Sequence, residues 1–294
     1  MKPRHRGASL VGLVISLGLS LFIILAALRV AAWSGADYVR TEQHALLQEQ
    51  AAHVLELVAA SLRQVGHLDP TQAMPALAAR PPEGALRGID DAIVPAGSPW
   101  LSAARGGNSG GSDALSIRLV GDAKGRTRNC AGLPVPEAAD ASDERGASVF
   151  HVADGPGGEP ELRCKYRGAS GWTSQAVASG IASFQLLYGI DTDGDGLPND
   201  FVSASRMRAL AAGAEASPWT RVVAVHVALL LRSAQPVPGL ARPAAVDLFG
   251  SAYSDLHAAD DPGTRLAASQ LRSGRLYRQF DAVIFLRNSL RPAA

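Results

Sequence analysis

The chain has 294 residues, of which 47% are hydrophobic and 5% aromatic, so it can bury one core of moderate size or two small ones. Its 28 basic and 27 acidic residues nearly cancel, and no basic face or platform of aromatic side chains stands out. The composition therefore excludes the electrostatic footprint of a protein that binds nucleic acid directly.

The first predicted element is an apolar helix near the N-terminus. No charged residue occurs between Ala8 and Leu28, and at ~1.5 Å per residue this stretch gives a helix of about 32 Å, which matches a hydrocarbon core of ~30 Å. Lys2, Arg4 and Arg6 precede the helix. This basic excess predicts that the N-terminus lies in the cytoplasm and that the rest of the chain is exported.

Two other interpretations of this segment stay open. A secretory signal could end at Val30-Ala31-Ala32, although its apolar region would ordinarily span only ~7 to 15 residues. A plain signal anchor would account for the apolar helix, but it would leave the short sequence Arg6-Gly7-Ala8-Ser9 unexplained.

That short sequence, followed at once by an apolar helix, resembles the class III signal of type IV prepilins. The resemblance implies that residues 1–7 form a leader, that a membrane-embedded prepilin peptidase cleaves between Gly7 and Ala8, and that Ala8 is then N-methylated. The sequence departs from the family at Gly12, the fifth mature position, where prepilins usually carry Glu.

We expect residues 8–32 to form the transmembrane or filament-core helix and residues 33–66 to continue it as an amphipathic helix that ends at Gly66. Apolar residues recur in this second part at spacings of three and four, which predicts one buried face. They are Leu47, Ala51, Val54, Leu55, Val58, Leu62 and Val65.

Residues 67–111 are rich in proline and glycine and are predicted to form a loop-rich excursion. Within them, Gly107-Asn108-Ser109-Gly110-Gly111 matches the G-x-S-x-G pattern, with His53 as a tempting partner. A nucleophile elbow needs a strand before it and a helix after it. This run instead lies in a glycine loop followed by a strand-like segment, so we expect no hydrolase and no enzyme.

Residues 112–294 carry a series of strand patterns and are expected to form a β-rich globular domain. These patterns lie at residues 115–119, 149–152, 162–166, 184–188, 222–231 and 280–286. Strands and helices do not alternate regularly, so the predicted fold class is α+β, with an antiparallel sheet packed on one long helix. His226 is expected to be a partly buried strand histidine rather than a ligand.

Two cysteines, Cys130 and Cys164, would lie outside the cytoplasm, where a pair is normally oxidised. We predict one disulfide that closes a loop of about 35 residues, worth roughly 3 to 4 kcal/mol in the chain-entropy model. Metal binding by two thiols is the weaker interpretation, because no CxxC motif or paired histidine accompanies them.

The strongest local chemistry is the segment Asp191-Thr192-Asp193-Gly194-Asp195-Gly196, which sets carboxylates at alternate positions with Gly at the sixth, as in calcium loops. The candidate calcium ligands are Asp191, Asp193, Asp195, Leu197, Asn199 and Asp200. Val202 stands where an EF-hand needs a bidentate Glu, so the segment is more similar to the short loops of thrombospondin-type repeats and dockerins. A solvated Asp-Gly turn between strands is the open alternative.

Three strings carry a second resemblance, namely SFQLLYGIDTDGDG, RVVAVHVALLLRS and GRLYRQFDAVIFLRN. They are similar to the PilW-like minor pilins of type IV pilus systems. The resemblance implies a type IV pilin fold, insertion in the inner membrane with the globular domain in the periplasm, and later incorporation at the cell surface. It also implies a non-enzymatic role in priming pilus assembly at or near the tip, with other minor pilins and an adhesin-like tip protein as partners.

The nearest alternative is a minor pseudopilin of a type II secretion system, which shares the leader, the helix and the sheet. A membrane-anchored periplasmic domain that binds calcium or hydrolyses a substrate is an alternative of a different class. Gly12 favours a position at the tip, because a subunit without the usual Glu offers no carboxylate to the methylated amine of a neighbour in the apolar filament core. The open alternatives are that Gly12 is ordinary divergence or that Ser9 or Ser16 takes the place of the Glu.

Overall fold

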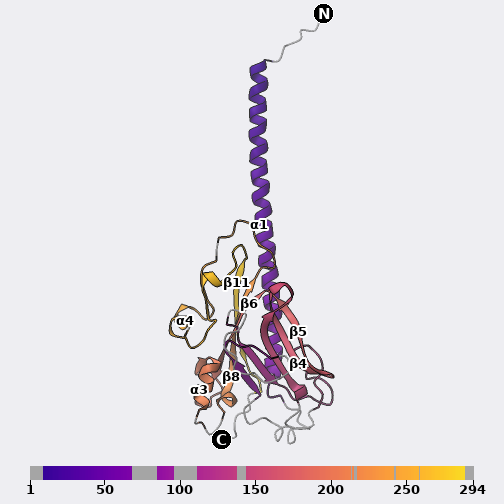
Figure 1. The fold of residues 1–294 in the computed structure, drawn as a ribbon, viewed down its shortest axis with the longest axis vertical. Coiled ribbons are helices and arrows are strands. Elements are labelled where there is room, and N and C mark those ends of the chain that lie inside the picture. Colours follow the sequence, from indigo (N-terminus) through magenta and orange to yellow (C-terminus); the bar gives the residue numbers. More distant parts are fainter. Residues whose placement is uncertain are drawn as a thin grey trace, which may run out of the picture.

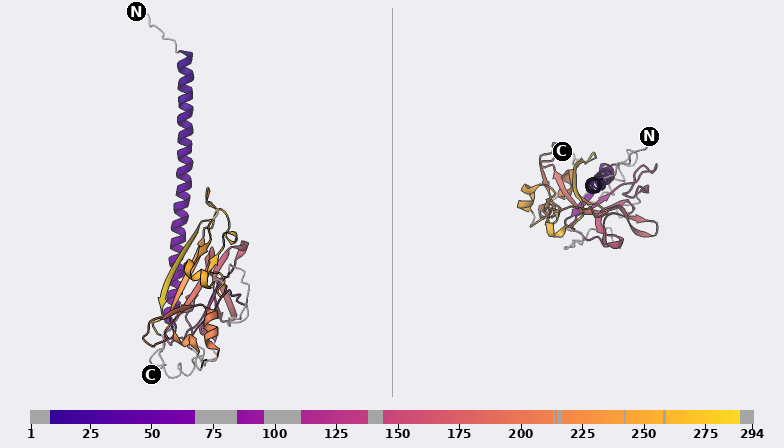
Figure 2. Two further views of the ribbon diagram at one scale, coloured as in Figure 1. Left: turned by 90° about the vertical axis from the view of Figure 1, so that its left-hand side faces the viewer. Right: turned by 90° about the horizontal axis from the view of Figure 1, so that it is seen from above.

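The structure is a computed structural model that describes residues 9–67, 85–95, 111–137, 144–212, 214, 217–241, 243–257 and 259–288. It consists of one long helix whose C-terminal half lies against a β-rich domain (Figures 1 and 2). The fold class is α+β with antiparallel sheets, as the sequence predicted.

The long helix, α1, spans Leu10–Gln64 without interruption. It ends where the sequence predicted, because Gly66 adopts φ +74°, a left-handed conformation that favours glycine and stops a helix. Its N-terminal half projects away from the domain in both side views (Figures 1 and 2).

The predicted apolar stripe on the C-terminal half of α1 is confirmed. Its members are buried in the main hydrophobic core, except Leu55, which is partly buried at the edge of that core. The helix packs chiefly on the last strand of the domain, β11, and also contacts β8 and β5. Spacing at i, i+3, i+4 and i+7 places these side chains on one face, and that face is the one that the domain covers.

The strands form two larger antiparallel sheets where the sequence predicted one. The five-stranded sheet has the order β1-β2-β3-β4-β5, so each strand pairs with its neighbour in sequence. Its strands are β1 (Leu86–Ile89), β2 (Ala114–Arg118), β3 (Ala147–Asp154), β4 (Pro160–Gly168) and β5 (Gly171–Ser179). Strand β1 lies within residues 67–111, where the sequence predicted only loops.

The four-stranded sheet has the order β11-β8-β6-β7. Its strands are β6 (Ile181–Ile190), β7 (Asp200–Val202), β8 (Val222–Arg232) and β11 (Tyr277–Phe285). Strands β6 and β8 are almost wholly buried, which explains their nearly continuous apolar sequences. Side chains of alternate residues on β8 enter different cores, because successive residues of a strand point to opposite faces.

One face of β8 belongs to the main core with α1, and the other belongs to a smaller core under a C-terminal insertion. The insertion holds β9 (Val246–Asp247), α4 (Ser251–His257) and β10 (Arg265–Leu266). Helix α3 (Ala204–Ala211) follows β7. Short 3-10 helices are η2 (Glu144–Gly146), η3 (Pro156–Gly158), η4 (Pro218–Arg221) and η5 (Ala268–Gln270).

Candidate functional site

The apolar half of α1 is the first candidate site. Among the described residues, Leu10–Ala31 is the one helical stretch that is long and apolar enough to cross a membrane, with a mean hydropathy of 2.7, and none of it is buried by the domain. The described part of the domain does not cover this stretch. The stretch therefore fits an anchor in a membrane or an insertion among other apolar helices.

The residues predicted for processing, Gly7 and Ala8, lie outside the described residues. Gly12 lies near the start of α1, is exposed, and has no other atom within 4 Å of the position a side chain would take. The G-x-S-x-G run also lies outside the described residues, apart from its last member, Gly111.

The predicted calcium loop connects β6 and β7. Asp191, Asp193 and Asp195 come together there, with one carboxylate oxygen from each within 4.8 Å of the others. Gly194 and Gly196 adopt φ values of +86° and +87°, which an L side chain rarely tolerates, so these glycines permit the tight turn.

Hydrogen bonds inside the loop fix these carboxylates. The two carboxylate oxygens of Asp191 accept from the backbone N–H groups of Gly194 and Gly196, at 2.6 and 2.8 Å. The side-chain amide of Asn199 donates to Asp193 at 3.1 Å. The loop thus gathers hard oxygen ligands and already stabilises itself through its own backbone, so its geometry suits both a calcium loop and a plain turn.

The other predicted ligands lie differently. Leu197 donates its N–H to Asp195 at 2.7 Å. Asp200 begins β7 and accepts a hydrogen bond from the N–H of Phe201, and it is not part of the group of three carboxylates.

The predicted disulfide is present. Cys130 and Cys164 are joined with a Cα to Cα distance of 5.7 Å, and both lie in the main core. The bond ties the segment after β2 to the centre of β4, the fourth strand in the order of the five-stranded sheet.

His226 occupies β8 and is partly buried, as expected. Its Nε2 atom lies 3.0 Å from a carboxylate oxygen of Asp281 on the neighbouring strand β11. Its ring meets Phe249 edge-on, with 5.0 Å between the ring centroids. These contacts describe a structural histidine at the junction between the sheet and the C-terminal insertion.

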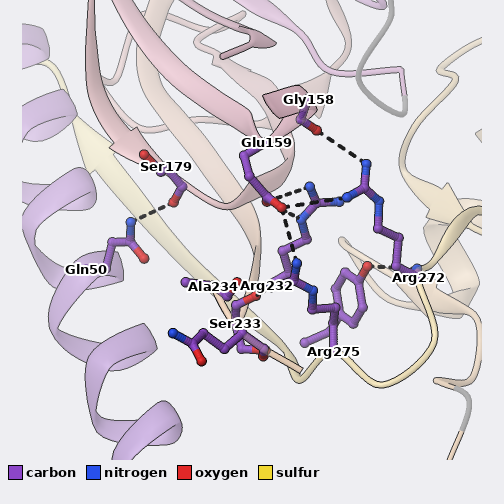
Figure 3. A network of polar contacts seen from close by, with 11 residues as sticks. Gln50, Gly158, Glu159, Ser179, Arg232, Ser233, Ala234, Arg272 and Arg275 are labelled. Carbon is purple, nitrogen blue, oxygen red and sulfur yellow. Dashed lines mark hydrogen bonds and ion pairs between the residues drawn. The ribbon is translucent and has the colours of Figure 1, made fainter. Parts of the chain in front are cut away.

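A cluster of charges around Glu159 was not predicted from the sequence (Figure 3). Arg232 donates to one carboxylate oxygen of Glu159 from Nε and Nη2, at 3.1 and 2.6 Å, and Arg275 approaches the other at 3.3 Å. Arg272 lies 3.6 Å from the same second oxygen. Burial alone would raise the pKa of Glu159, but the hydrogen bond and the three positive charges outweigh it, so the pKa lies below its usual range.

A second group of carboxylates was also missed. Asp90, Asp113 and Asp261 are all buried, and one oxygen atom from each lies within 4.8 Å of the other two. No sequence signal could have united them, because they come from segments far apart in the chain that only the fold brings together.

Comparison with known proteins gives one family match. The family model for the type IV pilus-assembly protein W matches residues 149–288. No curated protein matches the sequence at a significant level. A solved type IV-like pilin from Thermus thermophilus is similar over 83% of this chain and 98% of its own, with 15% identity and a TM-score of 0.38.

The family match covers the strands from β3 to β11, and the apolar N-terminal helix stands in front of them. Together these two features support a pilin role in type IV pilus assembly. The resemblance expected from the sequence is therefore confirmed: over residues 149–288, the chain is similar to the type IV pilus-assembly protein W family.

Proposed function

We propose that the chain is a minor pilin of a type IV pilus that primes assembly and occupies a position at or near the tip. The family match over residues 149–288 is the observation that carries this proposal. The architecture supports it, because α1 buries one half in the domain and leaves Leu10–Ala31 free to enter a membrane or a bundle of apolar helices. The role is structural and non-enzymatic.

The proposal includes processing and location. A prepilin peptidase removes residues 1–7, Ala8 is methylated, and α1 holds the protein in the inner membrane with its domain in the periplasm until assembly. The partners are other minor pilins and an adhesin-like tip protein, which contact the exposed apolar half of α1 and the surface of the domain.

N-terminal mass spectrometry of the mature protein tests the processing step. The expected first residue is a methylated Ala8, and a bulky substitution such as Gly7→Leu should leave the precursor uncut. A mature protein that begins at Trp33 would show cleavage as a secretory signal and would refute the pilin proposal.

Gly12 tests the position in the filament. The wild-type protein should be confined to one end of sheared pili in immunogold images, whereas Gly12→Glu should allow it to spread along the filament, because the new carboxylate can pair with a neighbour's amine. A matched control, Gly18→Glu, places the charge two turns further along the helix. Wild-type protein already spread along the pili would contradict a tip position, and its absence from pili would favour the pseudopilin alternative.

We also propose that the loop between β6 and β7 binds calcium through Asp191, Asp193 and Asp195. The support is the approach of the three carboxylates within 4.8 Å. Equilibrium dialysis of the full-length protein in detergent micelles should show one fewer bound Ca²⁺ in Asp193→Ala than in the wild type. The control Asp154→Ala removes an exposed carboxylate at the end of β3 and should bind as the wild type does. Equal binding in all three proteins would identify the loop as a plain turn.

A further inference from the structure

The three buried carboxylates lie where several parts of the fold meet. Asp90 directly follows β1, Asp113 directly precedes β2, and Asp261 lies between α4 and β10. Their exposed fractions are 7%, 1% and 1%, respectively. Among the described residues, no Lys, Arg or His forms an ion pair with any of them.

Backbone hydrogen bonds hold two of these carboxylates in place. Asp90 accepts from the N–H groups of Ala204 and Ser205, at 2.9 and 2.6 Å, at the start of α3. Asp113 accepts from the N–H of Leu186 in β6 at 2.7 Å. The group therefore links the five-stranded sheet to the four-stranded sheet and to α3.

Three buried carboxylates this close cannot all carry their charge without compensation, because water does not screen them. Burial, followed by the charges of Asp90 and Asp261, raises the pKa of Asp113 well above its usual range. Burial and the charge of Asp90 raise the pKa of Asp261 to about 7. A cation bound among the three carboxylates would compensate their charges.

Asp261 has one carboxylate oxygen without a hydrogen-bond partner among the described residues. Its Oδ2 accepts from the hydroxyl of Tyr253 at 2.9 Å, but its Oδ1 is buried and has no hydrogen-bond partner among the described residues. Buried polar atoms are nearly always paired, so an orphan oxygen is evidence of an ion or a water molecule beside it.

Gln185 supplies a second, independent sign of a ligand. Its side chain is fully buried, its Nε2 donates to the carbonyl of Gly111 at 2.8 Å, and its Oε1 has no partner among the described residues. The same amide lies against Gly263. Gly111 and Gly263 stand two residues from Asp113 and Asp261, so the amide group that carries the unpaired Oε1 lies beside the two segments that hold these carboxylates.

Tyr188 supplies a third sign from another direction. It is fully buried, its hydroxyl has no partner among the described residues, and it packs against Gly88, two residues before Asp90. Burial, followed by the charges of Asp113, Asp90 and Asp261, raises the pKa of Tyr188. Two segments, β6 and the stretch between α4 and β10, thus contribute buried oxygen atoms without a partner among the described residues.

We propose that Asp90, Asp113 and Asp261 bind one Ca²⁺ ion, with the Oε1 atom of Gln185 as a further ligand. Calcium takes oxygen ligands at about 2.3 to 2.6 Å, so two ligands of one ion lie at most about 5 Å apart, which suits oxygen atoms within 4.8 Å of one another. The smaller Mg²⁺ holds its ligands at about 2.0 to 2.1 Å and requires a tighter group.

The bound ion neutralises the three charges and replaces the protons that they otherwise retain. It also joins the C-terminal insertion, through Asp261, to the two sheets and α3. This site is separate from the loop between β6 and β7, and it does not depend on the proposed function in the pilus.

Equilibrium dialysis of the full-length protein in detergent micelles against Ca²⁺ tests the site. The protein used in this experiment carries Asp193→Ala, so that the loop between β6 and β7 does not contribute to the number of bound Ca²⁺ ions. We expect about one bound Ca²⁺ per chain, and none when Asp261→Asn is added. A matched control, Asp122→Asn, changes another buried carboxylate, one that is paired with Arg126 at 2.6 Å, and should leave the bound ion in place.

Thermal melting separates an ion ligand from a merely structural carboxylate. In EGTA at pH 7.5, Asp261→Asn should melt at the same temperature as its parent or higher, because it removes a repelling charge, and its melting temperature should not respond to Ca²⁺. If Asp261→Asn does not fold, Gln185→Met provides the comparison, with calcium affinity about tenfold weaker than in the parent. Absence of a bound ion from the Asp193→Ala protein overturns the proposal, and so does binding that neither variant changes.

Discussion

The side-chain amide of Asn288 donates a hydrogen bond to the backbone carbonyl of Arg63, with 3.0 Å between the nitrogen and the oxygen. The carbonyl groups of a helix's last turn have no partner within the helix, so Asn288 satisfies one of those at the end of α1. The chain segment that follows β11 thereby caps the C-terminal end of α1.

Substitution of Asn288 tests the contribution of this hydrogen bond to stability. Asn288→Ala should lower the free energy of unfolding by about 1 kcal/mol, since one hydrogen bond to a helix end is lost. Asn288→Asp should cost more, because a carboxylate cannot donate and would face the negative end of the helix dipole. Denaturant unfolding of the full-length protein in micelles measures both, and equal stability of all three proteins would show that the contact contributes nothing.

Gly66 is expected to be sensitive for two reasons. Its φ of +74° disfavours any side chain, and a methyl group there would meet the backbone carbonyl of Asn288. Gly132 shares the first property, with φ +76°, but has open space around it. Gly66→Ala should therefore lower the melting temperature more than Gly132→Ala does. The Gly132→Ala substitution should lower the free energy of unfolding by about 1 kcal/mol, through the unfavourable backbone conformation alone.

The arginines around Glu159 should differ in their contributions to stability (Figure 3). The side chain of Arg232 is 8% exposed, and that of Arg272 is 53% exposed. Arg232→Gln should lower the free energy of unfolding by about 2 kcal/mol or more, because a buried pair is broken, whereas Arg272→Gln should cost less than about 1 kcal/mol. Both variants remove a positive charge beside Glu159. Similar decreases in the free energy of unfolding, measured with denaturant, would contradict the claim that the buried Arg232 contributes more than the exposed Arg272.

The disulfide should be structural. A double variant with Cys130→Ala and Cys164→Ala is expected to lose roughly 3 to 4 kcal/mol in free energy of unfolding, because the unfolded chain is freed from a crosslink that spans 34 residues. Both cysteines are buried, so alkylation should be carried out on the unfolded, non-reduced protein, in which we expect no free thiol. Reaction of two thiols per chain would show that the bond does not form in the isolated protein.

His151 predicts a pH dependence of stability. Burial, followed by the charges of Lys165 and Arg163, lowers the pKa of His151 in the folded protein to about 4, from 6.5. Between these values the unfolded chain binds a proton that the folded chain does not, so the contribution of His151 to stability falls as the pH drops from about 6.5 toward 4. The full effect is on the order of 3 kcal/mol.

Unfolding in denaturant between pH 7.5 and pH 4.5 measures this contribution as the difference between the wild type and His151→Gln, because the buried Asp113 and Asp261 change stability in the opposite direction over the same range. Glutamine does not titrate, and it preserves a polar partner for the nearby Ser174 hydroxyl, 3.4 Å away. His53→Gln, on the exposed side of α1, serves as the control and should keep the pH dependence of the wild type. A pH dependence that persists unchanged in His151→Gln would mean that other groups cause it.

Much of the fold follows from local patterns in the sequence. The stripe of α1 and the apolar runs of β6 and β8 were predicted because burial on one or both faces dictates which residues can occur there. Strand β5 was missed because it is an edge strand, mostly exposed, whose polar side chains show no alternation. Strand β1 was missed because it is only four residues long and lies in a segment rich in proline and glycine.

The candidate sites also fall into those that the sequence predicted and those that only the structure shows. The loop at Asp191 was visible because its carboxylates are neighbours in the sequence, and the disulfide because only two cysteines exist. Asp90, Asp113 and Asp261 were invisible, since their approach depends on the pairing of β1 with β2 and on the position of the C-terminal insertion. Such proximity is a property of the tertiary fold, and no single segment encodes it.

The position of β11 beside α1 imposes an order on biosynthesis. Helix α1 is synthesised first, yet β11, the strand with which it has its most extensive contacts, is nearly the last part to be made. Until residues 277–288 are synthesised, the apolar stripe of α1 lacks these contacts, although β5 and β8 can already cover part of it. An unfinished chain therefore exposes apolar surface on α1, and a chaperone that binds such surface would protect it from aggregation.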